Sequence, residues 1–316
     1  MDRKKFLQTA GAGSLAMTLM PSGLWAAGQS LTAGSESRKL TILHTNDQHS
    51  QIEPFDASNA RNPNQGGFAR RASLIESIRK TENNVLLLDS GDIFQGTPYF
   101  NFFGGELEFK LMSMMRYDAA TMGNHDFDNG LEGFKKALPQ AKFPFICSNY
   151  DFSNTMLDGL TIPYKIFNKN GIRVGIFGLG VQLKGLVGKK QYQETEYLNP
   201  IEMAQHYSTI LKTDKKCDLV ICLSHLGYDY TGEPDKISDK DLVKNTENID
   251  LVLGGHTHTF LKEPQTLANR AGKNVLINQV GFAGLLLGRI EYYFSKDKKI
   301  ENIAWKNQWI DDQIIA

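Results

Sequence analysis

The sequence predicts an α/β sandwich, and two observations support this fold class. Short apolar runs of strand length recur along the chain from residue 40, and stretches with helical spacing of apolar side chains lie between them. Five of the seven histidines lie in short motifs at or just after the ends of such runs. In α/β folds strands alternate with helices, and functional side chains collect at the carboxyl ends of the strands.

The expected strands are the apolar runs themselves. They cover residues 40–43, 85–88, 119–122, 145–148, 174–179, 219–223, 251–253 and 275–277. Residues 288–294 and 298–305 then show strand and hairpin patterns, so the domain is expected to finish with β-structure.

Helices are expected between these runs, in residues 68–80, 106–115, 131–138 and 200–212. The first of them places Phe68, Ala72, Ile75 and Ile78 at helical spacing. Pro200 stands in the first turn of the last one, where proline is favoured. The pattern shows no internal repeat and no second domain boundary.

The composition is that of a globular chain. It has 316 residues, of which 41% are hydrophobic, enough for one large α/β domain. Beyond residue 26 the chain carries 32 basic and 34 acidic side chains, so no nucleic-acid partner is expected. The three cysteines, Cys147, Cys217 and Cys222, do not make a disulfide framework and are interpreted as packing residues.

The N-terminus has the order of a targeting signal. Residues 3–5 are basic, residues 6–20 are mildly apolar, and Pro21 and small residues follow. Residues 2–8 resemble a twin-arginine signal in which lysine replaces the second arginine. Twin-arginine and general secretory export therefore both stay open.

These features predict a signal peptide in residues 1–26, a linker in residues 27–38, and a periplasmic or extracellular location. A frayed cytosolic N-terminus is the alternative. No cysteine stands near the expected cleavage point, and no later run approaches about 18 apolar residues. We therefore expect no stable membrane anchor.

Two carboxylate motifs follow expected strands. Asp47 and His49 lie two residues apart, which in an extended segment puts both on one side, where they can bind one ion. Asp92 follows Gly91, and its two oxygens can bridge two ions. Taken alone, Asp47 and His49 could equally be part of a polar loop. Gly91 and Asp92, taken alone, would be interpreted as a common turn. Their place after buried strands favours a site.

Residues 123–128 form the most informative motif. Asn124 offers an amide oxygen as a neutral ligand. His125 is followed three residues later by Asp128, which is close enough to accept the second imidazole proton, as in an oriented acid–base histidine. The alternative is that these side chains only cap the helix expected at 131–138.

Three further histidines, His225, His256 and His258, also follow apolar runs. In an extended segment His256 and His258 point to one side. A single histidine at a strand end is more often satisfied by hydrogen bonds, but three of them are not well explained that way. Together with the other motifs they predict a metal site, interpreted as binuclear. The two remaining histidines, His44 and His206, are interpreted as structural.

The ordered set of motifs resembles that of the calcineurin-like metallophosphoesterase superfamily. Within it, residues 41–49 and 124–128 resemble the catalytic domain of the 5′-nucleotidase family, and the similarity covers roughly residues 40–310. The resemblance implies that residues 39–316 are the catalytic domain. It also implies a four-layer α/β/β/α sandwich, in which helices flank two mixed β-sheets.

The resemblance assigns ligands to two divalent metal ions. One ion would lie on Asp47, His49, Asp92 and His258, and the other on Asp92, Asn124, His225 and His256. Asp92 would be the bridge. Many 5′-nucleotidases carry glutamine at the position of His258. The mixed ligands suit Mn, Zn, Fe or Co better than Ca or Mg.

Catalysis is assigned, by the same resemblance, to His125 held by Asp128. His125 would stabilise the phosphoryl transition state or protonate the leaving oxygen, while a metal-bound hydroxide attacks phosphorus in line.

The implied function is hydrolysis of small phosphate esters, expected to be nucleotides, by an exported 5′-nucleotidase-like enzyme. Alternatives on the same site are a 2′,3′-cyclic phosphodiesterase and a hydrolase of UDP-sugars or sulfur esters. An alternative of another class is a non-catalytic metal-binding scaffold. Family members continue for roughly another domain, which holds the nucleobase. Selectivity here is therefore expected to be broad, to come from loops of this chain, or to come from a separate chain that supplies a substrate-binding domain.

Overall fold

The computed structural model describes residues 38–233 and 235–315. The predicted signal peptide in residues 1–26 and all but the last residue of the predicted linker in 27–38 lie outside the described residues. Within the described residues, every helix is too short or too polar to cross a bilayer.

The first β-sheet is mixed. Its strands lie in the order β13 (Ile300–Trp309), β12 (Leu286–Phe294), β1 (Arg38–Thr45), β2 (Val85–Asp89) and β3 (Ala119–Ala120). β1, β2 and β3 are parallel, whereas β12 is antiparallel to both β1 and β13. The carboxyl ends of β1, β2 and β3 therefore lie at one edge of this sheet.

The second sheet is mixed as well. Its order is β10 (Gln265–Ala268), β11 (Asn274–Asn278), β9 (Leu251–Leu253), β8 (Leu219–His225), β6 (Ile172–Gly180) and β5 (Tyr164–Lys169). The four central strands are parallel, and the two edge strands are antiparallel to their neighbours. A small ribbon, β4 (Tyr150–Asp151) with β7 (Glu196–Tyr197), stands apart from both sheets.

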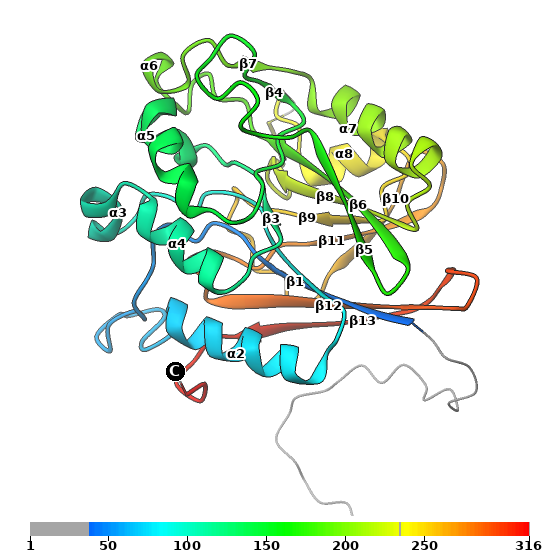
Figure 1. Cartoon of the computed structure of the whole chain (residues 1–316), viewed down its shortest axis with the longest axis horizontal. Helices are drawn as coiled ribbons and strands as arrows, with labels where there is room; N and C mark the ends of the chain where they lie inside the picture. Colours follow the sequence, from blue (N-terminus) through cyan, green and yellow to red (C-terminus); the bar gives the residue numbers. More distant parts are fainter. Residues whose placement is uncertain (1–37, 234, 316) are drawn as a thin grey trace, which may run out of the picture. The chain divides into compact units, whose positions relative to one another are not determined.

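Helices connect the strands. They are α2 (Phe68–Thr81), α3 (Pro98–Phe103), α4 (Glu106–Met114), α5 (Gly130–Ala137), α6 (Lys189–Tyr192), α7 (Pro200–Thr209) and α8 (Asp239–Asn245). Short 3-10 turns occupy His125–Phe127 and Leu138–Gln140, and a π-turn, Ile210–Asp214, follows α7. In Figure 1, α2 lies below the first sheet, and α7 and α8 lie on the far side of the second.

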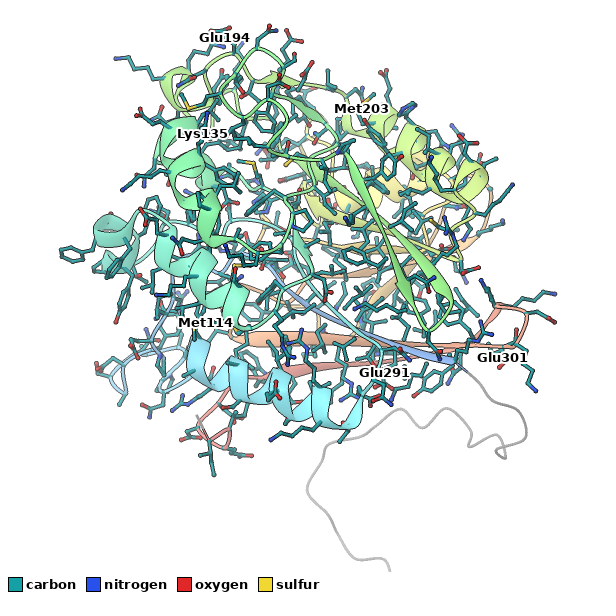
Figure 2. All side chains as sticks on the ribbon, viewed as in Figure 1. Met114, Lys135, Glu194, Met203, Glu291 and Glu301 are labelled. Carbon is teal, nitrogen blue, oxygen red and sulfur yellow. The ribbon has the colours of Figure 1, made fainter. Side chains whose placement is uncertain are left out.

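The central strands are buried on both faces, which explains why they read as continuous apolar runs. Ile42 and Leu88 point into the cluster between the sheets, which also contains Ile221 of β8. Leu43 and Leu87 point the other way, into the cluster under α2, α4 and α5. A third cluster joins the second sheet to α7 and α8. Figure 2 shows side chains filling these layers. The predicted four-layer sandwich of two mixed sheets is therefore confirmed.

Residues 145–148 do not form the strand that the sequence predicts. Phe145 and Ile146 make only isolated bridges. Successive backbone N–H groups pair with different segments: that of Ile146 donates to the Ala120 carbonyl at 2.8 Å, that of Cys147 to the Ile162 carbonyl at 2.9 Å and that of Ser148 to the Gly178 carbonyl at 2.7 Å. No continuous ladder forms with one neighbour. The neighbouring strand β3 is likewise shorter than predicted.

Three short helices, α3, α6 and α8, are absent from the sequence prediction. α8 begins with a capping box, in which Ser238 Oγ accepts the Asp241 N–H and the Asp241 carboxylate accepts the Ser238 N–H. This Ser-x-x-Asp pattern is a visible helix signal. α3 starts with Pro98 and has no side-chain cap, so its local signal is weaker.

A buried polar network joins the end of β2 to α2. The Asp89 carboxylate accepts hydrogen bonds from Thr45 Oγ1 at 2.6 Å and Gln48 Nε2 at 2.7 Å. Arg71, which is 1% exposed, donates to Gln48 Oε1 and lies 4.1 Å over the ring of Phe68. Burial raises the pKa of Asp89 to about 7, although these hydrogen bonds and Arg71 oppose the rise.

Asp89 is expected to make the folded chain less stable as the pH rises from 5 to 8. Its pKa is about 7 in the folded chain and about 3.9 in an unfolded one, so the folded state keeps a proton that the unfolded state has lost. That advantage disappears as the pH passes 7, a loss of about 3 kcal/mol over this range. In urea unfolding, wild type should therefore lose about 3 kcal/mol more than Asp89→Asn between pH 5 and pH 8. Equal losses would contradict the expectation.

Candidate metal centre

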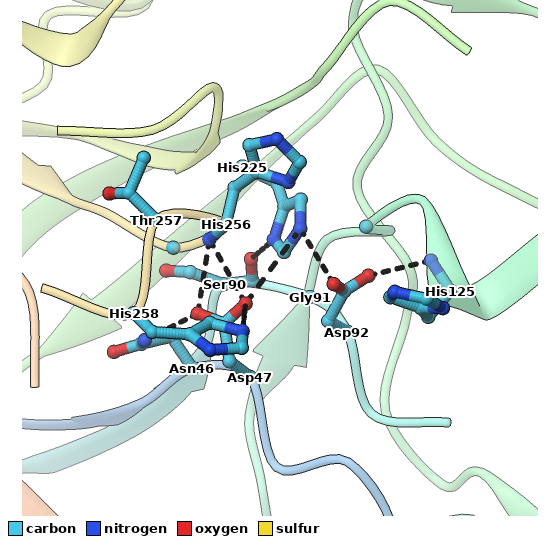
Figure 3. A network of polar contacts seen from close by, with 12 residues as sticks. Asn46, Asp47, Ser90, Gly91, Asp92, His125, His225, His256, Thr257 and His258 are labelled. Atoms are coloured by element: carbon cyan, nitrogen blue, oxygen red, sulfur yellow. Dashed lines mark hydrogen bonds and ion pairs between the residues drawn. The ribbon is translucent and has the colours of Figure 1, made fainter. Parts of the chain in front are cut away.

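The predicted site residues lie on loops at the carboxyl ends of five parallel strands. Asp47 and His49 follow β1, Asp92 follows β2, Asn124 and His125 follow β3, His225 ends β8, and His256 and His258 follow β9. Figure 3 shows that Asp47, Asp92, His225, His256 and His258 converge on one pocket, with His125 beside it. The two sheets thus bring together loops that are distant in sequence.

One group of metal-ligating side chains consists of Asp47, His49 and His258. The Nε2 atoms of His49 and His258 lie 2.9 Å apart, and Asp47 Oδ1 lies 3.4 Å from His258 Nε2 and 4.0 Å from His49 Nε2. All three ligand atoms lie within 4.8 Å of one another, which is close enough to share one ion.

The second group consists of Asp92, His225 and His256. Asp92 Oδ2 lies 3.2 Å from His225 Nε2 and also 3.9 Å from His49 Nε2 in the first group. Asp92 therefore stands between the two groups, as a bridging ligand must. Asn124 is the residue before His125, whose backbone N–H donates to Asp92 Oδ1 at 2.7 Å.

The backbone at five of these residues is left-handed rather than extended. The φ angles are 49° at Asp47, 48° at His49, 56° at Asp92, 72° at His256 and 52° at His258. The expectation that these pairs lie in extended segments is therefore wrong, although Asp47 and His49 still belong to one group. His256 and His258 turn into different groups instead. Residues other than glycine adopt this conformation at a cost, and such strain is typical of functional sites.

Glycines allow the loops after β2 and β3 to touch. A Cβ at Gly91 would lie 2.5 Å from the Gly123 nitrogen, and a Cβ at Gly123 would lie 2.2 Å from Asp92 Oδ1 and 2.6 Å from His225 Cε1. No larger residue fits either position without moving the backbone or a predicted ligand. The glycines of the two motifs thus set the distance between Asp92 and the motif that carries Asn124.

Hydrogen bonds orient the ligands. His225 Nδ1 lies 2.7 Å from the Ser90 carbonyl, which accepts its proton and leaves Nε2 facing the pocket. The His256 backbone N–H donates to both Asp47 carboxylate oxygens at 3.0 Å. Partners of this kind fix the tautomer and direction of metal-binding histidines.

The buried carboxylates at this centre favour binding of a cation. Burial disfavours ionisation of Asp92, but His225 outweighs burial and lowers the pKa of Asp92. Burial also opposes a proton on His225, but the carboxylates of Asp92 and Asp47 raise its pKa to about 10. Burial prevails at His256 and lowers its pKa to about 4. The carboxylates therefore hold positive charge where a metal ion would supply it.

The side chains present fit divalent metal ions. Among the described residues, Asn124 Oδ1 and His225 Nε2 are buried polar atoms without a hydrogen-bond partner. Such atoms are costly unless something binds them. Carboxylate, amide and imidazole ligands together favour a transition metal over Ca²⁺. The residues that would hold the ions are the two groups above, with Asn124 added to the second.

His125 lies at the rim of the centre and belongs to neither group. Its Nδ1 is 2.8 Å from Asp128 Oδ2, and this hydrogen bond is the main reason that the pKa of His125 is raised, against the effect of burial. The side chain of His125 is 37% exposed, so a substrate can reach it. No side-chain cap is formed by Asn124 or Asn129, the residues that precede the 3-10 turn and α5, which argues against the capping alternative.

Asp126 is a site residue that the sequence prediction missed. Its carboxylate accepts backbone hydrogen bonds from Asp92, Ile93, Phe94 and Gly123, at 2.8–3.2 Å. It therefore ties the loop that carries Asp92 to the loop that carries Asn124. The sequence shows an aspartate within a histidine motif, but it does not show the backbone N–H groups that this aspartate binds.

Asp126→Ala is expected to lower the free energy of unfolding by at least about 3 kcal/mol, because four backbone N–H groups lose their acceptor in a buried place. Urea unfolding measures this. Asp128→Ala, two residues further on, is the control: its carboxylate is 31% exposed and should change stability by less than about 1 kcal/mol. Equal losses in the two variants would contradict the anchoring role of Asp126.

Comparisons with known proteins agree with this geometry. The family model of calcineurin-like phosphoesterases matches residues 40–260. The chain is 36% identical over 253 residues to a snake venom 5′-nucleotidase of Crotalus adamanteus, which covers 78% of this chain and 41% of that protein. It is 33% identical over 304 residues to a 5′-nucleotidase of Homo sapiens, covering 86% of this chain and 50% of that protein. The chain thus spans about half the length of the curated relatives it matches.

Solved structures show the same fold. A 5′-nucleotidase precursor from Thermus thermophilus is 31% identical with a TM-score of 0.78, covering 88% of this chain and 55% of that one. The NAD nucleotidase of Haemophilus influenzae is 26% identical with a TM-score of 0.74, covering 87% and 50%. These matches confirm the expected fold, and the chain belongs to the calcineurin-like phosphoesterase family.

Proposed function

We propose that this chain hydrolyses the phosphate ester of nucleotides, as a 5′-nucleotidase-like enzyme with two divalent metal ions. The observation that carries the proposal is the His125–Asp128 pair standing beside two groups of metal ligands. Relatives named as 5′-nucleotidases support nucleotides as the substrate class. The pair also argues against a non-catalytic scaffold, since a metal site alone needs no oriented imidazole.

The residues divide the chemistry between them. Two bound divalent ions would screen the charge of the phosphate and lower the pKa of the attacking water. Asp92 lies between the two ligand groups and would therefore keep them in one geometry around the phosphate. His125, oriented by Asp128, would hold the proton that the leaving oxygen takes. This division of roles serves in-line displacement. The attacking water would approach phosphorus from the side of the metal ligands, and the leaving oxygen would depart on the opposite side.

Activity of the metal-loaded chain tests the proposal. The protein is stripped with a chelator, reloaded separately with Mn, Zn, Fe or Co, and assayed with AMP, a UDP-sugar, 2′,3′-cyclic AMP and a thiosulfate ester. The strongest metal-dependent hydrolysis is expected with AMP. Preferred hydrolysis of a cyclic diester, a UDP-sugar or the sulfur ester would replace the proposal by one of the alternatives, and absence of hydrolysis by fully loaded protein would favour the scaffold.

Export is a separate proposal. The relatives include venom 5′-nucleotidases, which supports an exported location for this chain. Fractionation of cells that express the full chain tests it, and recovery in the cytosol would contradict it.

A further inference from the structure

The loop that carries His256 and His258 turns sharply between the two histidines. It occupies residues 254–259, directly after β9, and the φ angles are 72° at His256 and 52° at His258. Left-handed backbone at residues other than glycine is costly, and it persists only where the surrounding structure holds it in place. This turn directs His256 into one ligand group and His258 into the other. Whatever holds the turn therefore affects both groups.

The Gln279 side chain bonds this loop at three points. Gln279 directly follows β11, which is parallel to β9, so the ends of the two strands lie side by side. Its Nε2 donates to the Gly255 carbonyl at 2.6 Å. Its Oε1 accepts the Thr259 N–H and, at 3.0 Å, the Thr257 hydroxyl. One carboxamide thus spans the turn from end to end.

Burial makes these hydrogen bonds important for the position of the loop. Gln279 is fully buried, so a displaced loop would leave buried polar groups unpaired, which is costly. Gly255 in turn packs tightly against the metal ligands. A Cβ at Gly255 would lie 2.8 Å from His225 Nδ1 and 3.2 Å from Asp47 Oδ2. The hydrogen bond from Gln279 therefore sets the place of a residue that touches ligands of both groups.

We propose that Gln279 is a positioning residue of the metal centre, whose carboxamide holds the turn that directs His256 and His258 into different ligand groups. Gln279 is not a ligand itself, because both ends of its carboxamide are bonded to the loop. Its role rests on the metal binding in the proposed function. Loss of a partner that orients metal ligands typically lowers metal affinity by about 10- to 100-fold. Because the turn serves both groups, loss of the carboxamide weakens binding of both ions.

A metal titration of Gln279→Met tests this role. Methionine has a similar length but cannot replace the three hydrogen bonds of the carboxamide. Chelator-stripped protein is titrated with Co²⁺, and the visible absorption of bound cobalt gives the number of ions and their affinities. The affinity for each ion should fall by about 10- to 100-fold relative to wild type. The absorption spectrum should change as well, because His256 and His258 are no longer held in one orientation.

Gln205→Met is the matched control. The Gln205 carboxamide on α7 also donates to a hydroxyl, that of Thr209 at 2.9 Å, and accepts a backbone N–H, that of Glu247 at 2.9 Å. Gln205 belongs to a different part of the second sheet's helical layer, so its variant should keep the cobalt affinity and spectrum of wild type. Unchanged cobalt affinity in Gln279→Met would overturn the positioning role, and so would an equal loss in both variants.

Amide hydrogen exchange of the wild-type protein tests the same contact without a substitution, so its result does not depend on the folding of a variant. The Thr259 N–H is bonded to Gln279 and should exchange more slowly than amides that are exposed to solvent. Exchange of the Thr259 N–H at the rate of an exposed amide would overturn the positioning role. Failure of wild type to bind Co²⁺ would instead overturn the metal binding on which the proposed function depends.

Discussion

His125→Asn is expected to lower kcat by about 10²- to 10⁴-fold while the protein keeps its metal ions. The imidazole lies outside both ligand groups, so its loss removes a proton-transfer group and no ligand. Asparagine cannot hold or donate a proton at the place of Nε2. Steady-state kinetics with AMP and elemental analysis of the same sample measure the two effects.

The control for this variant is His206→Asn. His206 is exposed on α7, away from the site, and its loss should change neither quantity. Asp128→Asn should reduce kcat less than His125→Asn does, because it only weakens the orientation of the imidazole through the 2.8 Å hydrogen bond. Turnover of His125→Asn equal to that of wild type would remove His125 from the mechanism.

Asp92→Ala is expected to release both metal ions and with them the activity. Its carboxylate lies within 4 Å of imidazole nitrogens in both groups, at His225 and His49. Loss of an outer partner of a metal ligand lowers metal affinity by about 10- to 100-fold, and loss of a shared ligand should exceed this. Metal content after dialysis, measured by elemental analysis, should fall below one ion per chain.

Asp229→Ala serves as the control for the loss of a carboxylate. Asp229 is exposed and pairs with Lys240 at 2.7 Å, outside the metal centre. Its variant should keep the metal content and kcat of wild type. Two ions per chain in Asp92→Ala would show that Asp92 is not a bridge.

Much of the fold could be predicted from the sequence because the central strands are buried on both faces. Their apolar runs, such as that of β8, are continuous and contrast with the amphipathic pattern of α2. The prediction was wrong at 145–148, where the backbone of an apolar run of strand length pairs with several different segments and not with one neighbouring strand. Periodicity reports burial, and it does not report which backbone groups are already taken.

The sequence by itself identified the candidate side chains for the proposed chemistry. Carboxylate, amide and imidazole groups are ligands by their nature, and their places after apolar runs are local facts. The His125–Asp128 contact is also local, since three residues separate the partners. These predictions needed only short spacings and the rule that strand ends collect functional groups.

Only the tertiary structure decided how those side chains are divided and what supports them. The His256 N–H binds the Asp47 carboxylate across 209 residues of sequence, and left-handed turns send His256 and His258 into different groups. The anchoring by Asp126 depends on similar long-range packing. Side-chain type is fixed residue by residue, whereas direction and neighbours follow from the joint packing of both sheets, which no short stretch of sequence contains.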